Sequence, residues 1–175
     1  MTVYWTLLGV IACERLAELV VSARHATALL RRGGREYGFS HFPVMIALHV
    51  GLLAGCVLEP LLGQRPFLPA LGWPMLAVTV AANGLRWWCI ATLGPSWSAR
   101  VIVVPGMPLV RSGPYRWFAH PNYVAVIVEG AALPLTGSAW ITACAFTAAN
   151  AVLLTVRIRG ETRALAGSAP ALVGP

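Results

Sequence analysis

The chain has 175 residues, of which 58% are hydrophobic and 11% are charged. Soluble globular domains carry about 25% charged residues, so this composition excludes an ordinary soluble domain. The formal net charge of +7 comes from 13 arginines set against six glutamates, because the sequence contains no lysine and no aspartate. Arginines placed between apolar stretches are typical of membrane-orienting loops, so we expect a lipid bilayer and no nucleic acid as partner. The four cysteines are far apart and lie in apolar runs, so we expect no metal site and no disulfide framework.

The apolar runs, taken in chain order, predict an all-α, polytopic membrane protein. A transmembrane helix needs about 20 predominantly apolar residues. The runs predict about five such helices: 3–21, 42–62, 70–93 and the two arms of 121–156, which separate at 134–138. The last two helices form a short hairpin, because its first arm, roughly 14 residues at 1.5 Å each, reaches only about 21 Å.

The distribution of arginines predicts the orientation of these helices. Ten arginines lie in the segments 22–41, 94–119 and 157–163, whereas Arg65 is alone on the opposite side. The positive-inside rule places the arginine-rich segments in the cytosol. We therefore expect an external N-terminus and a cytosolic C-terminus.

Several polar residues lie at one depth of the predicted spans, in their cytoplasmic half: Glu14, Glu18, His49, Arg86 and Glu129. Charged groups in lipid cost a few kcal/mol each, so this shared depth predicts a polar pocket between the helices that opens to the cytosol. Glu14 and Glu18 are four residues apart on one helix face, where like charges repel unless a partner such as Arg86 lies between them. Two interpretations stay open: an ion-pair cluster that fixes helix packing, and the lining of a substrate pocket.

A turn followed by a helix comes after the third predicted span. Gly113 and Pro114 predict the turn, and Pro121 predicts the first helical residue, because proline has no N–H group to leave unpaired there. His120 then lies at or next to the helix N-cap. The free N–H groups and the positive helix end suit an anionic ligand group such as a carboxylate. The alternative is an interfacial turn anchored by its aromatic residues.

Arg157 and Glu161 follow the last predicted span and are also four residues apart. On a helix they share a face, where they either pair with each other or hold a zwitterionic ligand together. This spacing alone does not choose between the two.

Together these segments resemble the isoprenylcysteine carboxyl methyltransferase family of integral membrane enzymes. The resemblance covers about residues 111–165 and rests on Gly113-Pro114-Tyr115, on Ala119-His120-Pro121-Asn122-Tyr123, and on Arg157 followed by Glu161-Thr162. Ala119 stands where the family motif has arginine, and Thr162 stands where it has a second glutamate. The N-terminal half, with residues 14–18 and 36–43, is similar to a bacterial branch associated with methylating polyketide-derived lipids such as alkylpyrones and phenolic lipids.

The resemblance implies methyl transfer from S-adenosylmethionine to a phenol, enol or carboxylate oxygen of a lipophilic acceptor, in a bacterial-type inner or plasma membrane. The implied cofactor contacts are Gly113, Pro114, Tyr115, His120, Pro121, Tyr123, Arg157 and Glu161. The catalytic residues are then His120 and Arg157, and the acceptor pocket is lined by Glu14, Glu18, His49 and Arg86. A phenol or an enol reacts best when deprotonated, which makes His120 or His49 the candidate base.

On this interpretation one compact membrane domain has two parts. Residues 1–93 form a three-span part that lines the acceptor pocket, and residues 94–175 form a cytosolic loop, a helical hairpin and a tail that make the cofactor site. Three alternatives stay open. They are an isoprenylcysteine-type carboxyl methyltransferase, an NADPH-dependent membrane reductase, because sterol reductases end in a similar His-Pro-x-Tyr segment, and a non-catalytic membrane protein or transporter. The sequence predicts no oligomeric state.

Overall fold

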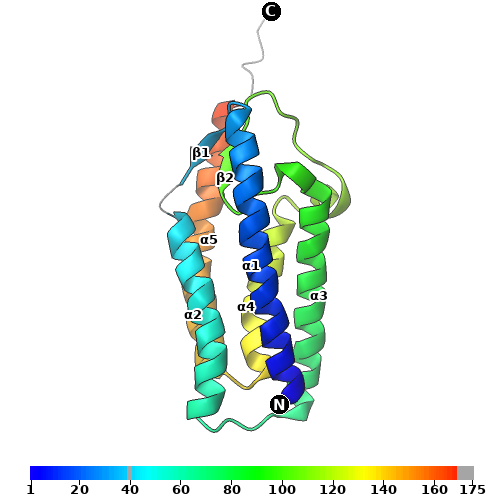
Figure 1. Cartoon of the computed structure of the whole chain (residues 1–175), viewed down its shortest axis with the longest axis vertical. Coiled ribbons are helices and arrows are strands. Elements are labelled where there is room, and N and C mark those ends of the chain that lie inside the picture. Colours follow the sequence, from blue (N-terminus) through cyan, green and yellow to red (C-terminus); the bar gives the residue numbers. More distant parts are fainter. Residues whose placement is uncertain (39–40, 169–175) are drawn as a thin grey trace, which may run out of the picture.

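The computed structural model describes residues 1–38 and 41–168, with side chains in the last helix described up to Arg163. Phe39 and Ser40, which belong to the segment similar to the bacterial branch, lie outside the described residues, as do residues 169–175 of the expected cofactor part. The described residues form five α-helices along one long axis (Figure 1). The elements are α1 (Thr2–Arg31), β1 (Arg35–Tyr37), α2 (His41–Leu62), α3 (Pro69–Leu93), the 3₁₀ turn η1 (Gly94–Ser96), β2 (Val101–Val103), the 3₁₀ turn η2 (Gly113–Arg116), α4 (Pro121–Thr136) and α5 (Trp140–Ser168). The all-α prediction is confirmed.

Three described helical segments are long and apolar enough to cross a membrane: His41–Leu62, Pro69–Ser96 and Trp140–Arg163. α1 has 30 residues but carries Glu14, Arg15 and Glu18 near its middle. α4 has 16 residues, which at 1.5 Å each span about 24 Å, less than a hydrocarbon core of about 30 Å. The charges of α1 therefore have to be shielded by neighbouring helices. α4 alone is too short to cross the hydrocarbon core.

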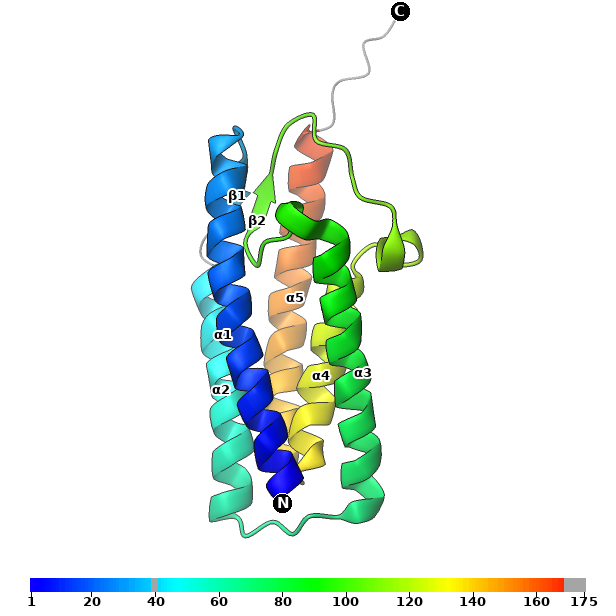
Figure 2. The ribbon, with the colours of Figure 1, turned by 45° about the vertical axis from the view of Figure 1, so that its right-hand side comes forward.

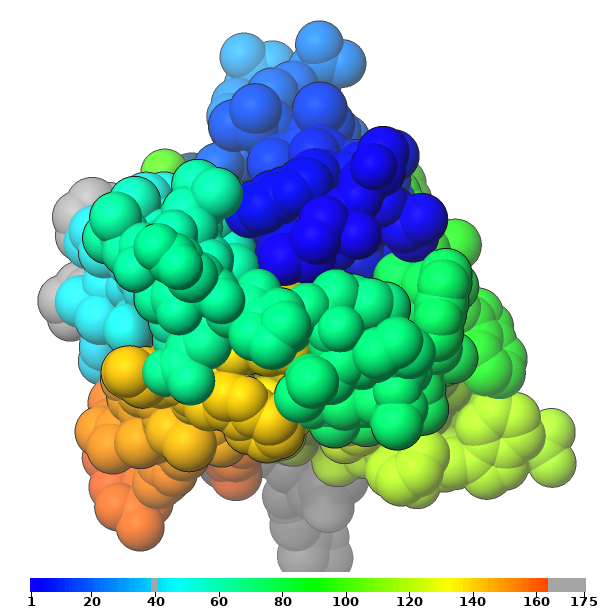
Figure 3. All heavy atoms as spheres, turned by 90° about the horizontal axis from the view of Figure 1, so that it is seen from below, coloured from blue at the N-terminus to red at the C-terminus, as the bar shows by residue number. Residues whose placement is uncertain are grey.

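The lower end of the bundle in Figure 1 is a packed apolar core. Its buried members come from α1, α2, α4 and α5: Tyr4, Leu8, Ile11, Leu52, Cys56, Leu133 and Phe146. The Tyr4 hydroxyl donates a hydrogen bond of 2.8 Å to the backbone oxygen of Cys56. Seen from below, the start of α1, the end of α2, the start of α3 and the α4–α5 turn lie side by side (Figure 3). This end therefore has tight helix packing.

The predicted hairpin of α4 and α5 is present, and its turn is held from α2. Gly137 and Ser138 make the turn, where Ser138 has a φ of 59°. Glu59 of α2 accepts hydrogen bonds from the backbone N–H groups of Ile141 (3.1 Å) and Thr142 (2.8 Å), in the first turn of α5. A carboxylate placed there satisfies free N–H groups and matches the positive helix end.

The upper end differs from the prediction, because the helix predicted over 3–21 continues to Arg31. Hydropathy marks only the apolar part of a helix, so it missed this polar extension. Gly33, with a φ of 82°, ends the helix, and the N–H of Gly34 bonds to the Leu29 oxygen. β1 then pairs antiparallel with β2, with Glu36 opposite Ile102 (Figure 2). No sequence pattern predicted this small sheet, which ties the α1–α2 connection to the segment after α3.

Candidate functional site

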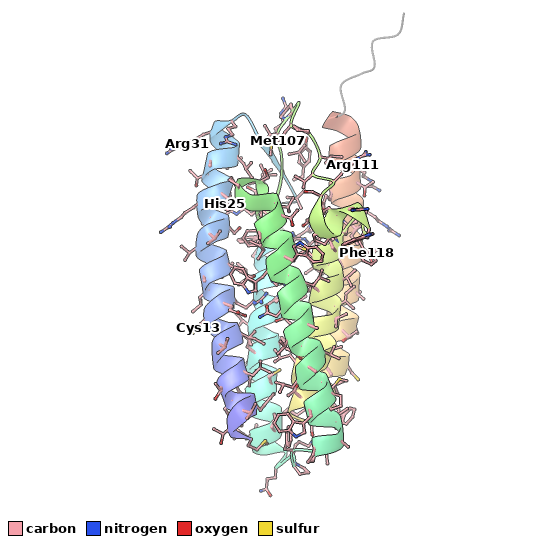
Figure 4. The ribbon with its side chains drawn as sticks, turned by 90° about the vertical axis from the view of Figure 1, so that its right-hand side faces the viewer. Cys13, His25, Arg31, Met107, Arg111 and Phe118 are labelled. Carbon is pink, nitrogen blue, oxygen red and sulfur yellow. The ribbon has the colours of Figure 1, made fainter. Side chains whose placement is uncertain are left out.

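A pocket of about 750 Å³ occupies the upper half of the bundle. Its walls come from all five helices, from β2 and from the segment 104–111 that crosses the upper end. Met107 and Arg111 line the pocket from that segment, and Figure 4 shows both at the upper end of the molecule. The packed core therefore lies below the pocket, and the pocket lies at the end that holds most arginines.

One wall carries His120, Tyr123 and Glu161. Pro121 is the first residue of α4 and His120 is its N-cap, as the sequence predicted. The Tyr123 hydroxyl donates a 2.8 Å hydrogen bond to Glu161 Oε2, and His120 Nδ1 lies 3.7 Å from the same oxygen. The His120 and Tyr123 rings stack with centroids 5.3 Å apart. The Glu161 carboxylate of α5 therefore contacts two side chains at the start of α4.

Arg157 lies on the same wall, one helical turn before Glu161, and is 6% exposed. Its Nη2 donates to the Ala99 backbone oxygen at 2.8 Å, and its Nη1 lies 2.9 Å from Met45 Sδ. Its Nε is buried without a hydrogen-bond partner. Within the described part of the chain, no carboxylate lies at ion-pair distance from this guanidinium. A buried cation held only by neutral groups favours an anionic ligand.

Two further polar side chains face the same space. Asn122 Oδ1 is buried without a partner, which leaves one free acceptor in the first turn of α4. Tyr115 lines the pocket from η2, and burial raises the pKa of its phenol, so the hydroxyl stays protonated. Asn122 and Tyr115 add neutral polar groups to a wall that already carries the Arg157 cation and the Glu161 carboxylate. We refer to His120, Asn122, Tyr123, Arg157 and Glu161 as the cofactor end of the pocket, a name taken from the cofactor contacts that the sequence resemblance implies for this wall.

Gly113, Pro114 and Pro121 do not line the pocket. Gly113 has a φ of 54°, and a side chain there would collide with Thr92 of α3. Pro114 and Pro121 are fully buried. These residues hold η2 and the start of α4 against α3, so the structure places them in support of the wall. Their contact with a ligand stays a prediction.

An ion-pair network joins α1, α3 and α4 deeper in the pocket. Glu18 accepts from Arg86 Nε at 2.9 Å, from Arg86 Nη2 at 2.8 Å and from Arg15 Nη1 at 3.1 Å. Glu129 lies 3.6 Å from Arg15 and 3.9 Å from Arg86. The sequence predicted a partner such as Arg86 between Glu14 and Glu18; in the structure Arg86 pairs with Glu18, and Arg15 is the cation near both glutamates. Because Glu18, Arg15 and Arg86 also line the pocket, helix packing and pocket lining are served by the same side chains.

Glu14 corrects the prediction of a four-residue lining set. It accepts hydrogen bonds from the Asn83 amide and from the Trp87 indole (3.2 Å), and it does not line the pocket. Arg15 Nη2 donates to Asn83 Oδ1 at 2.9 Å and lies 4.0 Å from Glu14 Oε2, so Glu14 joins the edge of the ion-pair network. The prediction from the sequence missed Arg15 and Asn83, although Arg15 lies at the same depth as Glu18 and was detectable by that signal.

His49, the remaining predicted lining residue, does line the pocket. Its ring packs edge-on against Phe146 of α5, with centroids 5.5 Å apart. We refer to Arg15, Glu18, His49 and Arg86 as the deep end of the pocket. Within the described ranges, no group of three or more histidine, cysteine or acidic residues is placed to hold a metal ion.

The described residues form a bundle in which three helical segments are long and apolar enough to cross a membrane, and a large pocket in it joins a polar end to a deeper, charge-paired end. Residues 75–167, more than half of the chain, match the isoprenylcysteine carboxyl methyltransferase (ICMT) family. The chain belongs to this family, and this membership identifies it as a membrane methyltransferase. Members of the family generally use S-adenosylmethionine.

Two bacterial proteins are similar over almost their full length. One is the Bacillus subtilis (strain 168) protein "Uncharacterized protein YpbQ", which is 37% identical over 163 residues, covering 93% of this chain and 96% of the relative. The other is an "Uncharacterized protein" of Haemophilus influenzae (strain ATCC 51907 / DSM 11121 / KW20 / Rd), 26% identical over 152 residues, covering 86% of this chain and 88% of the relative. Neither name states a substrate.

Proposed function

We propose that the protein transfers a methyl group from S-adenosylmethionine to an oxygen of a lipophilic acceptor, which we take to be a polyketide-derived lipid. The observation that carries this proposal is the continuity of the pocket. Its cofactor end holds Arg157 and Glu161, and its walls also include apolar residues of α1 and α2 such as Leu16 and Val50, which are largely exposed. A polar cofactor and an apolar acceptor can therefore meet in one space.

The residues at the cofactor end fit S-adenosylmethionine chemically. The Arg157 guanidinium suits the carboxylate of the amino-acid moiety, and its unpartnered Nε offers a donor. Glu161 and Asn122 Oδ1 suit the ammonium group, since one is an anion and the other is a free acceptor. When bound, the cofactor supplies a methyl group on a positively charged sulfur.

The protein's own contribution is to position the acceptor and to exclude water. Methyl transfer needs the acceptor oxygen in line with the methyl–sulfur bond, and orientation of this kind supplies a large part of the barrier reduction. The apolar walls of α1 and α2 hold an apolar chain, and Arg157, at the border of the two ends, orients the acceptor oxygen. A dry site also strengthens these electrostatic contacts.

The orientation in the membrane is part of the proposal. The upper end carries the C-terminal part of α5 and Arg31, Arg111 and Arg163, which favours a cytosolic location. The cofactor end then faces the compartment that supplies S-adenosylmethionine. The acceptor reaches the deep end from the bilayer.

The proposal is tested by calorimetric titration of detergent-purified variants with S-adenosylhomocysteine. We expect His120→Ala and Glu161→Ala to abolish detectable binding, because both side chains meet at the cofactor end. Arg159→Ala is the control, since Arg159 is exposed on the same helix and does not line the pocket. Thermal unfolding shows whether each variant is folded. Two folded pocket variants with unchanged affinity would contradict the cofactor assignment.

A further inference from the structure

The deep end of the pocket contains a histidine that the cofactor assignment leaves without a role. Of the four histidines, all in the described part of the chain, His49 and His120 line the pocket and His25 and His41 do not. His120 lies 3.7 Å from Glu161 and stacks on Tyr123, so it belongs to the cofactor end. His49 is therefore the imidazole nearest the acceptor's side of the pocket.

The hydrogen bond of His49 determines its tautomer. Nδ1 lies 2.8 Å from the backbone carbonyl oxygen of Met45. A carbonyl oxygen only accepts hydrogen bonds, so Nδ1 must carry the hydrogen and donate it. In the neutral ring, Nε2 then holds a free lone pair. No described residue hydrogen-bonds to Nε2, so this nitrogen is free to accept a proton from a ligand.

Met45 places His49 next to the border of the two ends. The Met45 sulfur lies 2.9 Å from Arg157 Nη1, while its carbonyl oxygen receives the His49 hydrogen bond. His49 follows Met45 by one helical turn, and residues so spaced lie about 5–6 Å apart on the helix surface. The Phe146 ring packs against the imidazole at an angle of 83° and limits its rotation. Met45 therefore connects Arg157 to the turn of α2 that carries His49.

The charges around His49 are paired with one another. Arg15 and Glu18 face it from α1, Arg86 from α3 and Glu129 from α4, where Glu129 lines a small cavity together with His49. Two cations and two carboxylates formally cancel, and each carboxylate lies within 3.9 Å of an arginine.

We propose that His49 is the catalytic base that removes the hydroxyl proton of the acceptor, which is then a phenol or an enol. This inference rests on the proposed function. In the step, the acceptor O–H bond breaks and its proton goes to Nε2. The oxygen forms a bond to the methyl carbon while the methyl–sulfur bond breaks, and sulfur keeps the electron pair. The products are a methyl ether, S-adenosylhomocysteine and a protonated His49, which returns its proton to solvent. A carboxylate acceptor needs no such base.

The test compares two acceptors of different acidity in the full-length protein in detergent. The first probe is 3-pentadecylphenol, and the second is its 4-nitro derivative, which is already ionised at a mildly alkaline assay pH. We expect His49→Gln to lower kcat/KM for the first probe by about 100-fold or more, because a positioned base contributes about that factor. The nitro probe needs no base, so its kcat/KM stays near that of the wild type. The matched control is His25→Gln, since His25 also bonds to a backbone oxygen, that of Trp97, but lies outside the pocket.

A second readout needs no turnover. With S-adenosylhomocysteine present, at a pH below the pKa of the free nitro probe, the wild type shifts bound probe toward the coloured phenolate, and His49→Gln does not. Equal rate losses with both probes, or a wild-type rate for the phenol in His49→Gln, overturn the role of His49 and leave the proposed function standing. So does methylation of a long-chain carboxylate when neither phenol reacts. Failure of the wild type to bind S-adenosylhomocysteine overturns both proposals.

Discussion

Two buried arginines show opposite arrangements of charge in one pocket. Arg86 is paired with carboxylates: its Nε and Nη2 donate to Glu18, and its Nη1 has no hydrogen-bond partner but lies 3.9 Å from Glu129. Arg157 has neutral partners only, the Ala99 oxygen and the Met45 sulfur. Removing a carboxylate partner of Arg86 would leave a buried charge without compensation. Arg157 already lacks a carboxylate partner, so it favours binding of an anionic ligand. Arg86 is therefore a structural cation, and Arg157 is suited to bind a ligand.

Replacing Glu18 by Gln tests the double role of the deep end. The change removes a charge-assisted contact with Arg86, so we expect unfolding in detergent to lose about 2 kcal/mol of free energy. Because Glu18 lines the pocket, the KM for a lipid acceptor should rise while affinity for S-adenosylhomocysteine stays nearly constant. Glu14→Gln is the matched control, since Glu14 is off the pocket wall. A stable Glu18→Gln protein with wild-type kinetics refutes the lining role.

Replacing Arg157 by Lys separates charge from geometry at the cofactor end. Lysine keeps the positive charge but loses the planar fork that reaches both Ala99 and the pocket. We expect affinity for S-adenosylhomocysteine to fall by about tenfold or more, which corresponds to about 1.4 kcal/mol. Calorimetry measures the loss. An unchanged dissociation constant would show that charge alone is sufficient there.

The hairpin depends on one close helix contact. A methyl group added at Gly130 of α4 would collide with the ring of Phe146 on α5. Small residues allow helices in membranes to approach closely, so Gly130→Ala should lower stability by about 1–3 kcal/mol. In contrast, Gly84 of α3 has open space around it, and Gly84→Ala should be neutral or stabilising. Thermal unfolding of both variants checks this, and equal transitions would argue against a tight α4–α5 interface.

Helix positions were predictable where a local signal marks them. Pro121 set the start of α4, and Gly137-Ser138 lies in the break expected between the last two helices. The extension of α1 to Arg31 and the β1–β2 pair were not predictable, because both depend on contacts made after folding. Ser22 accepts from the Ala99 backbone N–H at 2.9 Å, across 77 residues of chain, and no local pattern encodes such a contact.

The site also contains features that a local sequence pattern predicts and features that depend on contacts between distant residues. Spacing of four residues placed Arg157 and Glu161 on one face of α5, and both line the pocket. Spacing failed for Glu14, which shares a face with Glu18, because Asn83 and Trp87 of another helix decide where its carboxylate lies. Asn122 was recognised only as a motif position, since its unpartnered oxygen is visible only in three dimensions.

At the scale of the whole molecule, the packed core and the pocket lie at opposite ends of the bundle. The core around Tyr4 and Leu133 closes the lower end, and the arginine-rich upper end carries the cofactor end. Reporter fusions should place residue 30 and the C-terminus in the cytosol and residue 65 outside. A cytosolic residue 65 would put the cofactor end on the wrong side of the membrane for S-adenosylmethionine.

The central claim is that the cofactor end around Arg157 and Glu161 binds S-adenosylmethionine. The most direct measurement is calorimetric titration of the purified wild-type protein in detergent with S-adenosylhomocysteine, and separately with NADPH. The account predicts saturable binding of S-adenosylhomocysteine and none of NADPH. Binding of NADPH alone would indicate a reductase, and binding of neither by folded protein would contradict the methyltransferase assignment of this pocket.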